Sequence, residues 1–458
     1  MNIFKILLLF SLVLGQEIPN EFSEFYKRKI LIDLGINWSQ NSIFGPIRLI
    51  HDKRDNDSLL IQNRFGFEAS TDNSKAIYGY GHFTYNKFFY GYLYSRIVND
   101  PDRFQRYSGV SRDIARSGFT SGETDLSGIC YENNWLILQF GRGRQSWGAG
   151  NDIQLGISEN SNPYDYGMID LDFGKLRVRY FNGYLETDSL SISRFITGRG
   201  IEWNNQKNII LGLSEVVVYS GKNRTIDFAY LNPISTHLEI ELNDKQNNLG
   251  TDSGNAVWQF SLDHLLLNKI KISFNYLFDE FVLDKVQKDK NKISSGAYSL
   301  KFVYIPKFNN IFRLTTFYTS IIKVGTNTFR HEDGNNNFVN RGSPLGWTGG
   351  SDSREYQLGI NSFINKKRIM MKLGIGKKEI GENTINENTY YKYTNFVQGK
   401  FPSGEIKTKV FINGEFHWWV KPYLRFIFDY DYNLIDKHNT LTELNFGINF
   451  FYPMNTKI

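Results

Sequence analysis

Residues 422–432 read PYLRFIFDYDY, and apolar and polar side chains alternate along them. One face of this stretch carries Leu424, Phe426, Phe428, Tyr430 and Tyr432. The opposite face carries Arg425, Asp429 and Asp431, with Ile427 as its only apolar member. Because residues two apart share a face of a β-strand, this pattern predicts a strand with one apolar and one polar face.

The same period of two recurs along the chain, at residues 175–180, 270–278, 298–304 and 444–452. In the second of these segments Ile270, Ile272 and Phe274 alternate with Lys271 and Ser273. Short polar breaks between such runs predict hairpin turns, for example at 71–74, 86–87, 204–205 and Asn413-Gly414. The sequence therefore predicts an all-β protein.

Periodicity does not tell whether the apolar faces contact a protein core, as in a soluble sandwich, or lipid, as in a membrane barrel. Strands of about 10 residues suit a tilted membrane strand, and aromatic residues gather near strand ends, as at 88–92 and 450–452. At roughly 25 residues per strand and connection, about 443 residues give on the order of 18 strands. We expect a single transmembrane antiparallel β-barrel of about 18 strands over residues 16–458, with polar rim loops. Short helices are expected at 17–28 and 101–116.

The first fifteen residues have the pattern of a secretory signal peptide. Lys5 supplies a positive charge, residues 6–14 are apolar, and Gly15 offers a small residue at the cleavage site. A buried first helix is the alternative. No later apolar run approaches the roughly 20 residues that a spanning helix needs, so an exported chain of this kind can cross a membrane only as a closed barrel. We expect a Gram-negative outer membrane, with its lipids and the barrel-assembly machinery as partners.

The composition of the 458-residue chain excludes several classes of protein. The single cysteine, Cys130, excludes a disulfide scaffold and any cysteine-built metal site. The net charge of +6 is spread along the chain and does not indicate nucleic acid. The glycine-rich residues 141–150 lack the following helix of a nucleotide loop, and residues 55–57 and 333–337 are more typical of surface loops than of calcium sites. With no catalytic motif present, we expect no enzyme, cofactor or metal.

Six arginines lie between residues 142 and 199, among several aromatic residues. Guanidinium groups suit carboxylates and sulfates, and aromatic faces suit sugar rings. The candidate ligands for an acidic polysaccharide are Arg142, Arg144, Trp147, Arg177, Arg179, Arg199 and Trp203. In the alternative, these arginines pair with acids inside the barrel, namely Asp170, Asp172, Glu186, Glu202 and Glu215.

Five segments within residues 128–284 carry a family resemblance: GRGRQSWGAG at 141–150, RFITGRGIEW at 194–203, LGLSEVVVY at 211–219, YLNPI at 230–234 and LFDEF at 277–281. In this order they resemble the capsule assembly Wzi family of outer-membrane proteins. The resemblance implies an 18-stranded outer-membrane barrel with a blocked lumen. It also implies a surface lectin that helps to attach capsular or exopolysaccharide and catalyses no reaction. A porin-like transport channel is the alternative function, and a barrel hydrolase would need paired catalytic residues that no motif indicates.

Overall fold

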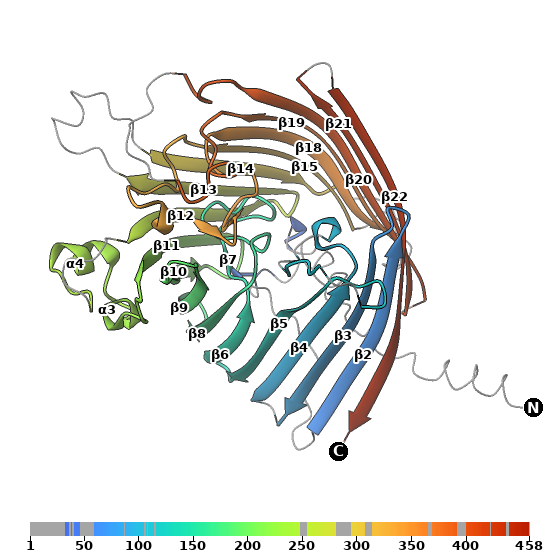
Figure 1. Ribbon diagram of the computed structural model, residues 1–458, viewed down its shortest axis with the longest axis horizontal. Coiled ribbons are helices and arrows are strands. Elements are labelled where there is room, and N and C mark those ends of the chain that lie inside the picture. The colour runs from blue at the N-terminus through green and yellow to red at the C-terminus, as the bar shows by residue number, and fades with distance from the viewer. Residues whose placement is uncertain are drawn as a thin grey trace, which may run out of the picture.

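A computed structural model of the protein describes residues 33–35, 38, 41–45, 59–86, 88–104, 107, 109–113, 116–247, 254–280, 295–306, 314–364, 369–391, 400–421, 423–436 and 439–457. These residues form a wall of antiparallel strands around an interior that is itself occupied by chain (Figure 1). Each strand of the wall pairs with its neighbours in chain order, and the last strand pairs with the first. The predicted barrel of about 18 strands is confirmed.

The strands of the wall are β2 (Leu59–Ser70), β3 (Lys75–Tyr85), β4 (Phe89–Val98), β5 (Ser121–Glu132), β6 (Leu136–Gly143), β8 (Tyr164–Asp172), β9 (Leu176–Thr187), β10 (Ile192–Asn204), β11 (Ile209–Lys222), β12 (Asn255–Leu266), β13 (Ile270–Glu280), β14 (Ser295–Tyr304), β15 (Leu314–Val324), β18 (Ser353–Ile364), β19 (Ile369–Ile380), β20 (Lys407–Lys421), β21 (Leu424–Ile435) and β22 (Asn439–Lys457). Among the residues that the structure describes, no helix is both long and apolar enough to cross a membrane.

The two faces of the wall follow the alternation in the sequence. Arg425 is only 4% exposed and lies toward the lumen, whereas its neighbour Phe426 is 41% exposed on the outer surface. Lys271 and Ser273 are fully buried inside, and Ile270 is exposed outside. At these positions the outward stripe is apolar and the inward stripe is polar, which is the arrangement of a transmembrane barrel.

The two ends of the barrel differ in their connections. One end, which we call the turn rim, has tight links such as 86–88, 133–135, 173–175 and 205–208. The other end, the loop rim, carries much longer connections, for example 99–120, 144–163, 223–254, 325–352 and 381–406. In bacterial outer-membrane barrels the short turns are periplasmic and the longer loops are extracellular.

Two sequence-based expectations about local structure are wrong. Asn413-Gly414 lies inside β20, where Asn413 pairs with Gly374 and Asp431, and neither residue has the positive φ that a tight hairpin turn needs. Gly414 instead leaves room for Leu373, whose Cδ2 would lie 3.1 Å from a Cβ atom at this position. Residues 101–116 hold only the 3-10 turn η2 (Pro101–Arg103) in their described part.

The helices occur elsewhere. In the described chain they are α3 (Phe228–Leu231) and α4 (His237–Leu242), both in the connection between β11 and β12. Asp227 caps α3 by accepting a hydrogen bond from the backbone N–H of Ala229, and Thr236 caps α4 by accepting one from that of Glu239. The predicted helix at 17–28 and the predicted signal peptide lie outside the described residues.

A plug fills part of the lumen. Its main segment, residues 144–163, follows β6, and its strand β7 (Ser146–Trp147) pairs with β1 (Phe44–Gly45) from the amino-terminal region. Trp147 is 1% exposed at the centre of the largest hydrophobic cluster, with its ring 4.9 Å from that of Phe44 and 5.1 Å from that of Phe181. The core of this barrel therefore lies inside the wall.

The plug is fixed to the loop between β15 and β18, which contains η3 (Gly334–Asn336), β16 (Val339–Asn340) and β17 (Ser343–Pro344). The backbone N–H of Trp347 donates to the carbonyl oxygen of Leu155 at 3.2 Å, and that of Ser158 donates to the carbonyl oxygen of Leu345 at 2.8 Å. Only glycine fits at position 346, because a Cβ atom there would lie 1.7 Å from the carbonyl oxygen of Leu155.

This close contact gives a stability prediction. Gly346→Ala is expected to lower the free energy of unfolding by about 1–3 kcal/mol, because the added methyl group forces the loop away from the plug. Urea unfolding followed by tryptophan fluorescence measures the change. Gly122→Ala is the control, since its Cβ atom would meet no atom closer than 3.8 Å. Equal stability of the two variants would contradict the docked plug.

Candidate functional site

The seven side chains predicted to bind a ligand do not come together in one site. Arg144, Trp147, Arg177 and Arg179 lie on the lumen side, where Trp147 is enclosed in the plug. Arg142 shares the outer side of the wall with Asp165 and Phe140, Arg199 lies on the outer side beneath α3 and α4, and Trp203 is 43% exposed on the outer surface. Alternation along the strands separates them.

Each of the five candidate arginines forms an ion pair. Arg144 lies 2.6 Å from Asp125, Arg142 lies 3.3 Å from Glu123, and Arg199 lies 3.2 Å from Glu215. The remaining pairs are Arg177 with Asp172 and Asp170, and Arg179 with Asp170. Pairing with the acids expected from the sequence therefore occurs for Arg177, Arg179 and Arg199, although the pair of Arg199 with Glu215 lies on the outer side of the wall. Arg142 and Arg144 pair instead with Glu123 and Asp125. Contact of these arginines with a ligand stays a prediction.

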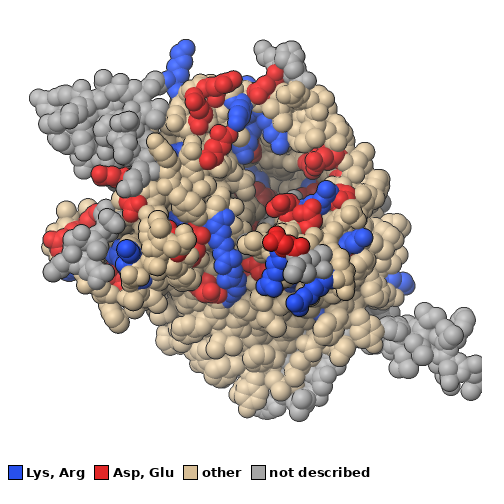
Figure 2. Space-filling model, viewed as in Figure 1, with Lys and Arg blue, Asp and Glu red and all other residues tan. Residues whose placement is uncertain are grey.

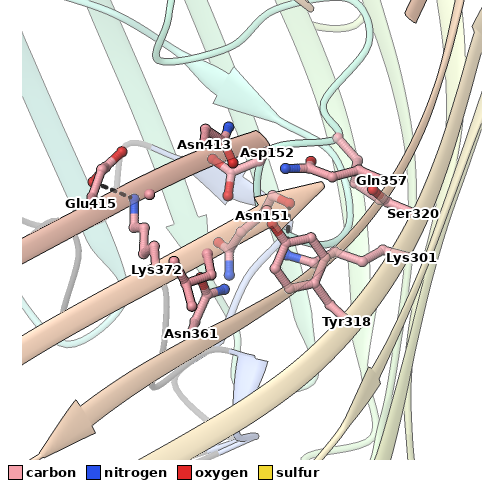
Figure 3. Close-up of a pocket in the computed structure, with 14 residues that line it drawn as sticks. Asn151, Asp152, Lys301, Tyr318, Ser320, Gln357, Asn361, Lys372, Asn413 and Glu415 are labelled. Atoms are coloured by element: carbon pink, nitrogen blue, oxygen red, sulfur yellow. Dashed lines mark hydrogen bonds and ion pairs between the residues drawn. The ribbon is translucent and has the colours of Figure 1, made fainter. Parts of the chain in front are cut away.

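A polar recess of about 200 Å³ lies in the lumen between the plug and the opposite wall (Figure 3). Its polar lining consists of Asn151, Asp152, Lys301, Tyr318, Ser320, Gln357, Asn361, Lys372, Asn413 and Glu415. The first two belong to the plug, and the others project inward from β14, β15, β18, β19 and β20. Each wall residue comes from the polar stripe of its strand, so the alternation of the sequence is what places it there.

Lys301 fixes the plug to the wall at this recess. Its Nζ donates to Asp33 Oδ2 and to the carbonyl oxygen of Asn151, both at 3.1 Å, and lies 4.8 Å from the ring centroid of Tyr318. Asn151 Nδ2 also donates to Asp33 Oδ1 at 2.8 Å. Three distant segments of the chain thus meet around one buried ammonium group.

Besides Lys301, one ammonium group and two carboxylates line the recess. Lys372 Nζ lies 3.2 Å from Glu415 Oε2, and Asp152 adds a further carboxylate. The amides of Gln357, Asn361 and Asn413 each offer both donors and acceptors. Such a lining suits a ligand that presents many hydroxyl groups, because each hydroxyl both donates and accepts a hydrogen bond.

Loops are fastened to the wall at the loop rim. Arg194 of β10 donates to the carbonyl oxygens of Asn335 at 2.5 Å and Asn337 at 2.7 Å. Tyr390, in the connection between β19 and β20, donates to Glu186 Oε1 at 2.6 Å. Burial, with Glu186 beside it, raises the pKa of Tyr390 to about 12. These contacts hold two long loops over the same part of the wall.

Charged side chains of both signs gather within the outline of the barrel, whereas its outer surface in this view is mostly uncharged (Figure 2). Among the described residues, no three His, Cys, Asp or Glu side chains are placed to hold a metal ion. Asp333, from one of the calcium-like stretches, caps η3 by accepting a hydrogen bond from the N–H of Asn335 at 3.1 Å. Residues 55–57 lie outside the described part.

The barrel is similar in fold to Wzi. This outer-membrane protein of Escherichia coli, involved in group 1 capsule assembly, is described as a carbohydrate-binding β-barrel. The likeness covers 86% of this chain and 84% of Wzi with a TM-score of 0.58, at 12% sequence identity. No protein-family model and no curated protein sequence matches the chain.

Two Pseudomonas aeruginosa outer-membrane proteins are more distant. OprD matches over 87% of this chain and 95% of its own, with 12% identity and a TM-score of 0.47. OpdK matches over 87% and 99%, with 9% identity and a TM-score of 0.47. At this distance the two likenesses do not inform function. The likeness to Wzi, by contrast, confirms at the level of the fold the family resemblance seen in the sequence motifs.

Sequence reasoning missed the recess. Lys301 stands on the polar face of a segment whose alternation is plain in the sequence, and the same is true of Lys271, so the residues themselves were visible. Neither Tyr318 nor Gln357 belongs to a motif. Their grouping depends on which strands face the plug, and no local pattern carries that information.

The buried Lys301 gives a second stability prediction. Lys301→Met is expected to lower the free energy of unfolding by about 3–5 kcal/mol, because it leaves the Asp33 carboxylate buried without its cation. Adding Asp33→Asn should recover part of the loss, which urea unfolding measures. Lys407→Met is the control, because the pair of Lys407 with Glu387 is exposed and should matter little. If the single variant were as stable as the unchanged protein, the proposed role of Lys301 would be wrong.

Proposed function

We propose that the protein is a non-enzymatic barrel of a Gram-negative outer membrane that binds a capsular or extracellular polysaccharide and helps to hold it at the cell surface. The observation that carries this proposal is the docked plug, which leaves a small amide-lined recess in the lumen. The fold likeness to Wzi supports it, since Wzi is described as binding carbohydrate. The proposal also includes export through a cleaved signal peptide at 1–15 and membrane insertion by the barrel-assembly machinery.

Binding is favoured over passage because the plug is attached to two neighbouring strands of the wall and to the loop between β15 and β18. Asn275 of β13 accepts from the backbone N–H of Ala149 at 2.7 Å and donates to the carbonyl oxygen of the same residue at 2.9 Å. Ser299 of β14 donates to the carbonyl oxygen of Ile153 at 2.7 Å. Together with the hydrogen bonds to Leu345 and Trp347, these bonds hold the plug in place inside the lumen.

For the class of polysaccharide, we keep an acidic glycan as the proposal. The arginines that suggested an acidic glycan are paired with carboxylates. In the recess, Lys372 is more accessible than Lys301, because its side chain is 22% exposed and that of Lys301 is 2% exposed. An acidic sugar would compete with Glu415 for this ammonium group. That competition makes binding sensitive to salt, because an exposed charge interaction weakens as ionic strength rises.

Binding of defined oligosaccharides tests the proposal. We expect the purified barrel to bind polyuronate oligosaccharides more tightly than dextran oligosaccharides of equal length, with the difference shrinking as salt is added. Gln357→Leu combined with Asn413→Leu should weaken binding at least about fivefold, because each lost hydrogen bond contributes about 0.5–1.5 kcal/mol. Titration calorimetry measures both effects.

The matched control is Asn433→Leu, which removes a buried amide from β21 outside the recess and should leave binding unchanged. Loss of binding in the control alone would place the ligand elsewhere. Equal binding of dextran and polyuronate at every salt concentration would show that the proposed preference for an acidic glycan is wrong. A steady open current in planar bilayers would favour the transport channel over the polysaccharide-binding barrel.

A further inference from the structure

The connection between β11 and β12 folds back over the outer side of the barrel wall. We call its residues 226–242, which include α3 and α4, the flap; Figure 1 shows the two helices outside the wall beside β10 and β11. On β10, Ile196 faces the plug, whereas Phe195, Thr197 and Arg199 face outward with the flap over them. The flap thus occupies a surface that other strands present to the membrane.

The inner side of the flap is firmly attached to this wall. The ring of Tyr230 stacks on that of Tyr219 with 4.3 Å between centroids, in a cluster with Phe195, Val217 and Ile240. The hydroxyl of Tyr180 donates to the carbonyl oxygen of Tyr230 at 2.8 Å. In addition, the backbone N–H of His237 donates to the carboxylate of Glu215 at 3.1 Å.

These contacts set the depth of the flap along the barrel. Glu215 lies at the middle of the 14-residue strand β11, and its ion-pair partner Arg199 lies near the middle of the 13-residue strand β10. An uncovered outward arginine at the bilayer midplane would cost about 2–4 kcal/mol. The flap covers this pair, and Glu215 is only 1% exposed. A flap bonded at mid-strand extends below the loop rim, to the level where the wall meets lipid.

The outer side of the flap is apolar. Six large side chains on it are between 37% and 85% exposed, namely Ile226, Phe228, Leu231, Ile234, Leu238 and Leu242. Below them the outward residues Ile201 and Leu213 of the wall are also exposed, so the apolar surface continues from the wall onto the flap. The acidic side chains of α4 are paired: Glu239 with Lys245, which follows the helix, and Glu241 with His237 at 3.3 Å. A charged side beside an apolar one is expected for an amphipathic element at a membrane interface.

We propose that the flap is a membrane-contacting element and that these six side chains insert among the acyl chains of the outer leaflet. Lipid is the expected contact because the apolar surface of the flap is continuous with the lipid-facing surface of the wall. The capping bonds of Asp227 and Thr236 satisfy backbone groups of both helices, and Asn232 Oδ1 accepts from the N–H of Ile234 at 3.1 Å. Such internal pairing lowers the cost of bringing backbone groups close to the water-free hydrocarbon region.

Site-directed spin labelling tests the proposal. In a Cys130→Ser background, Ile234→Cys carries a nitroxide on the flap, Leu213→Cys marks the lipid-facing wall, and Val110→Cys marks a loop-rim residue that is 82% exposed. The barrels are reconstituted in vesicles of phosphatidylethanolamine and phosphatidylglycerol. Collision rates are measured with oxygen, which concentrates in lipid, and with a nickel chelate, which stays in water.

We expect the oxygen-to-nickel ratio at residue 234 to match that at 213 and to be several-fold higher than that at 110. A ratio nearer to the value at 110 overturns the proposal and leaves the apolar face for a protein partner. Gel mobility of unheated samples verifies that each barrel is folded. Leu242→Cys, on α4, is the second reporter if the Ile234 variant does not fold.

Discussion

Each strand of this barrel separates two media, and the whole structure depends on that constraint. Alternate side chains must suit lipid on one side and a polar interior on the other, as Phe426 and Arg425 do in adjacent positions. A ring of eighteen strands also encloses more space than the wall side chains can fill. The chain fills part of that space with the segment around Trp147, so the hydrophobic core lies inside the wall and includes inward-facing wall residues such as Phe181 and Leu277.

Placing a core inside a polar lumen has a consequence for binding. The plug packs its apolar side chains against inward-facing wall residues such as Phe181 and Leu277. Its backbone groups need polar partners as well, which Asn275, Ser299 and Lys301 provide. Where the fit between plug and wall is incomplete, the remaining surface is rich in amides. The recess is therefore a by-product of the way the plug is held.

The wall was predictable and the interior was not. Alternation near Arg425 and Lys271 is local, so it revealed the strands, their faces and the class of fold directly. The Asn413-Gly414 pair shows where local signals fail, because pairing with β19 and β21 overrides its turn preference. Arg177 and Arg199 look alike in sequence, yet one faces the lumen and the other lies under the flap. A register shift between Arg194 and Phe195, together with the turn that joins β9 to β10, reverses which residues face the lumen. Neither feature can be recognised from the sequence alone.

The pairing of β2 with β22 joins Phe65 to Tyr452, residues from opposite ends of the described chain. Until that seam forms, the sheet has two open edges whose backbone groups would recruit any other strand within reach. These edges are therefore exposed to unwanted pairing until the ring closes. A polypeptide that lacked its final strand would keep nearly all of its inward and outward faces. It would nevertheless be unable to close the barrel, because β2 would have no β22 to pair with.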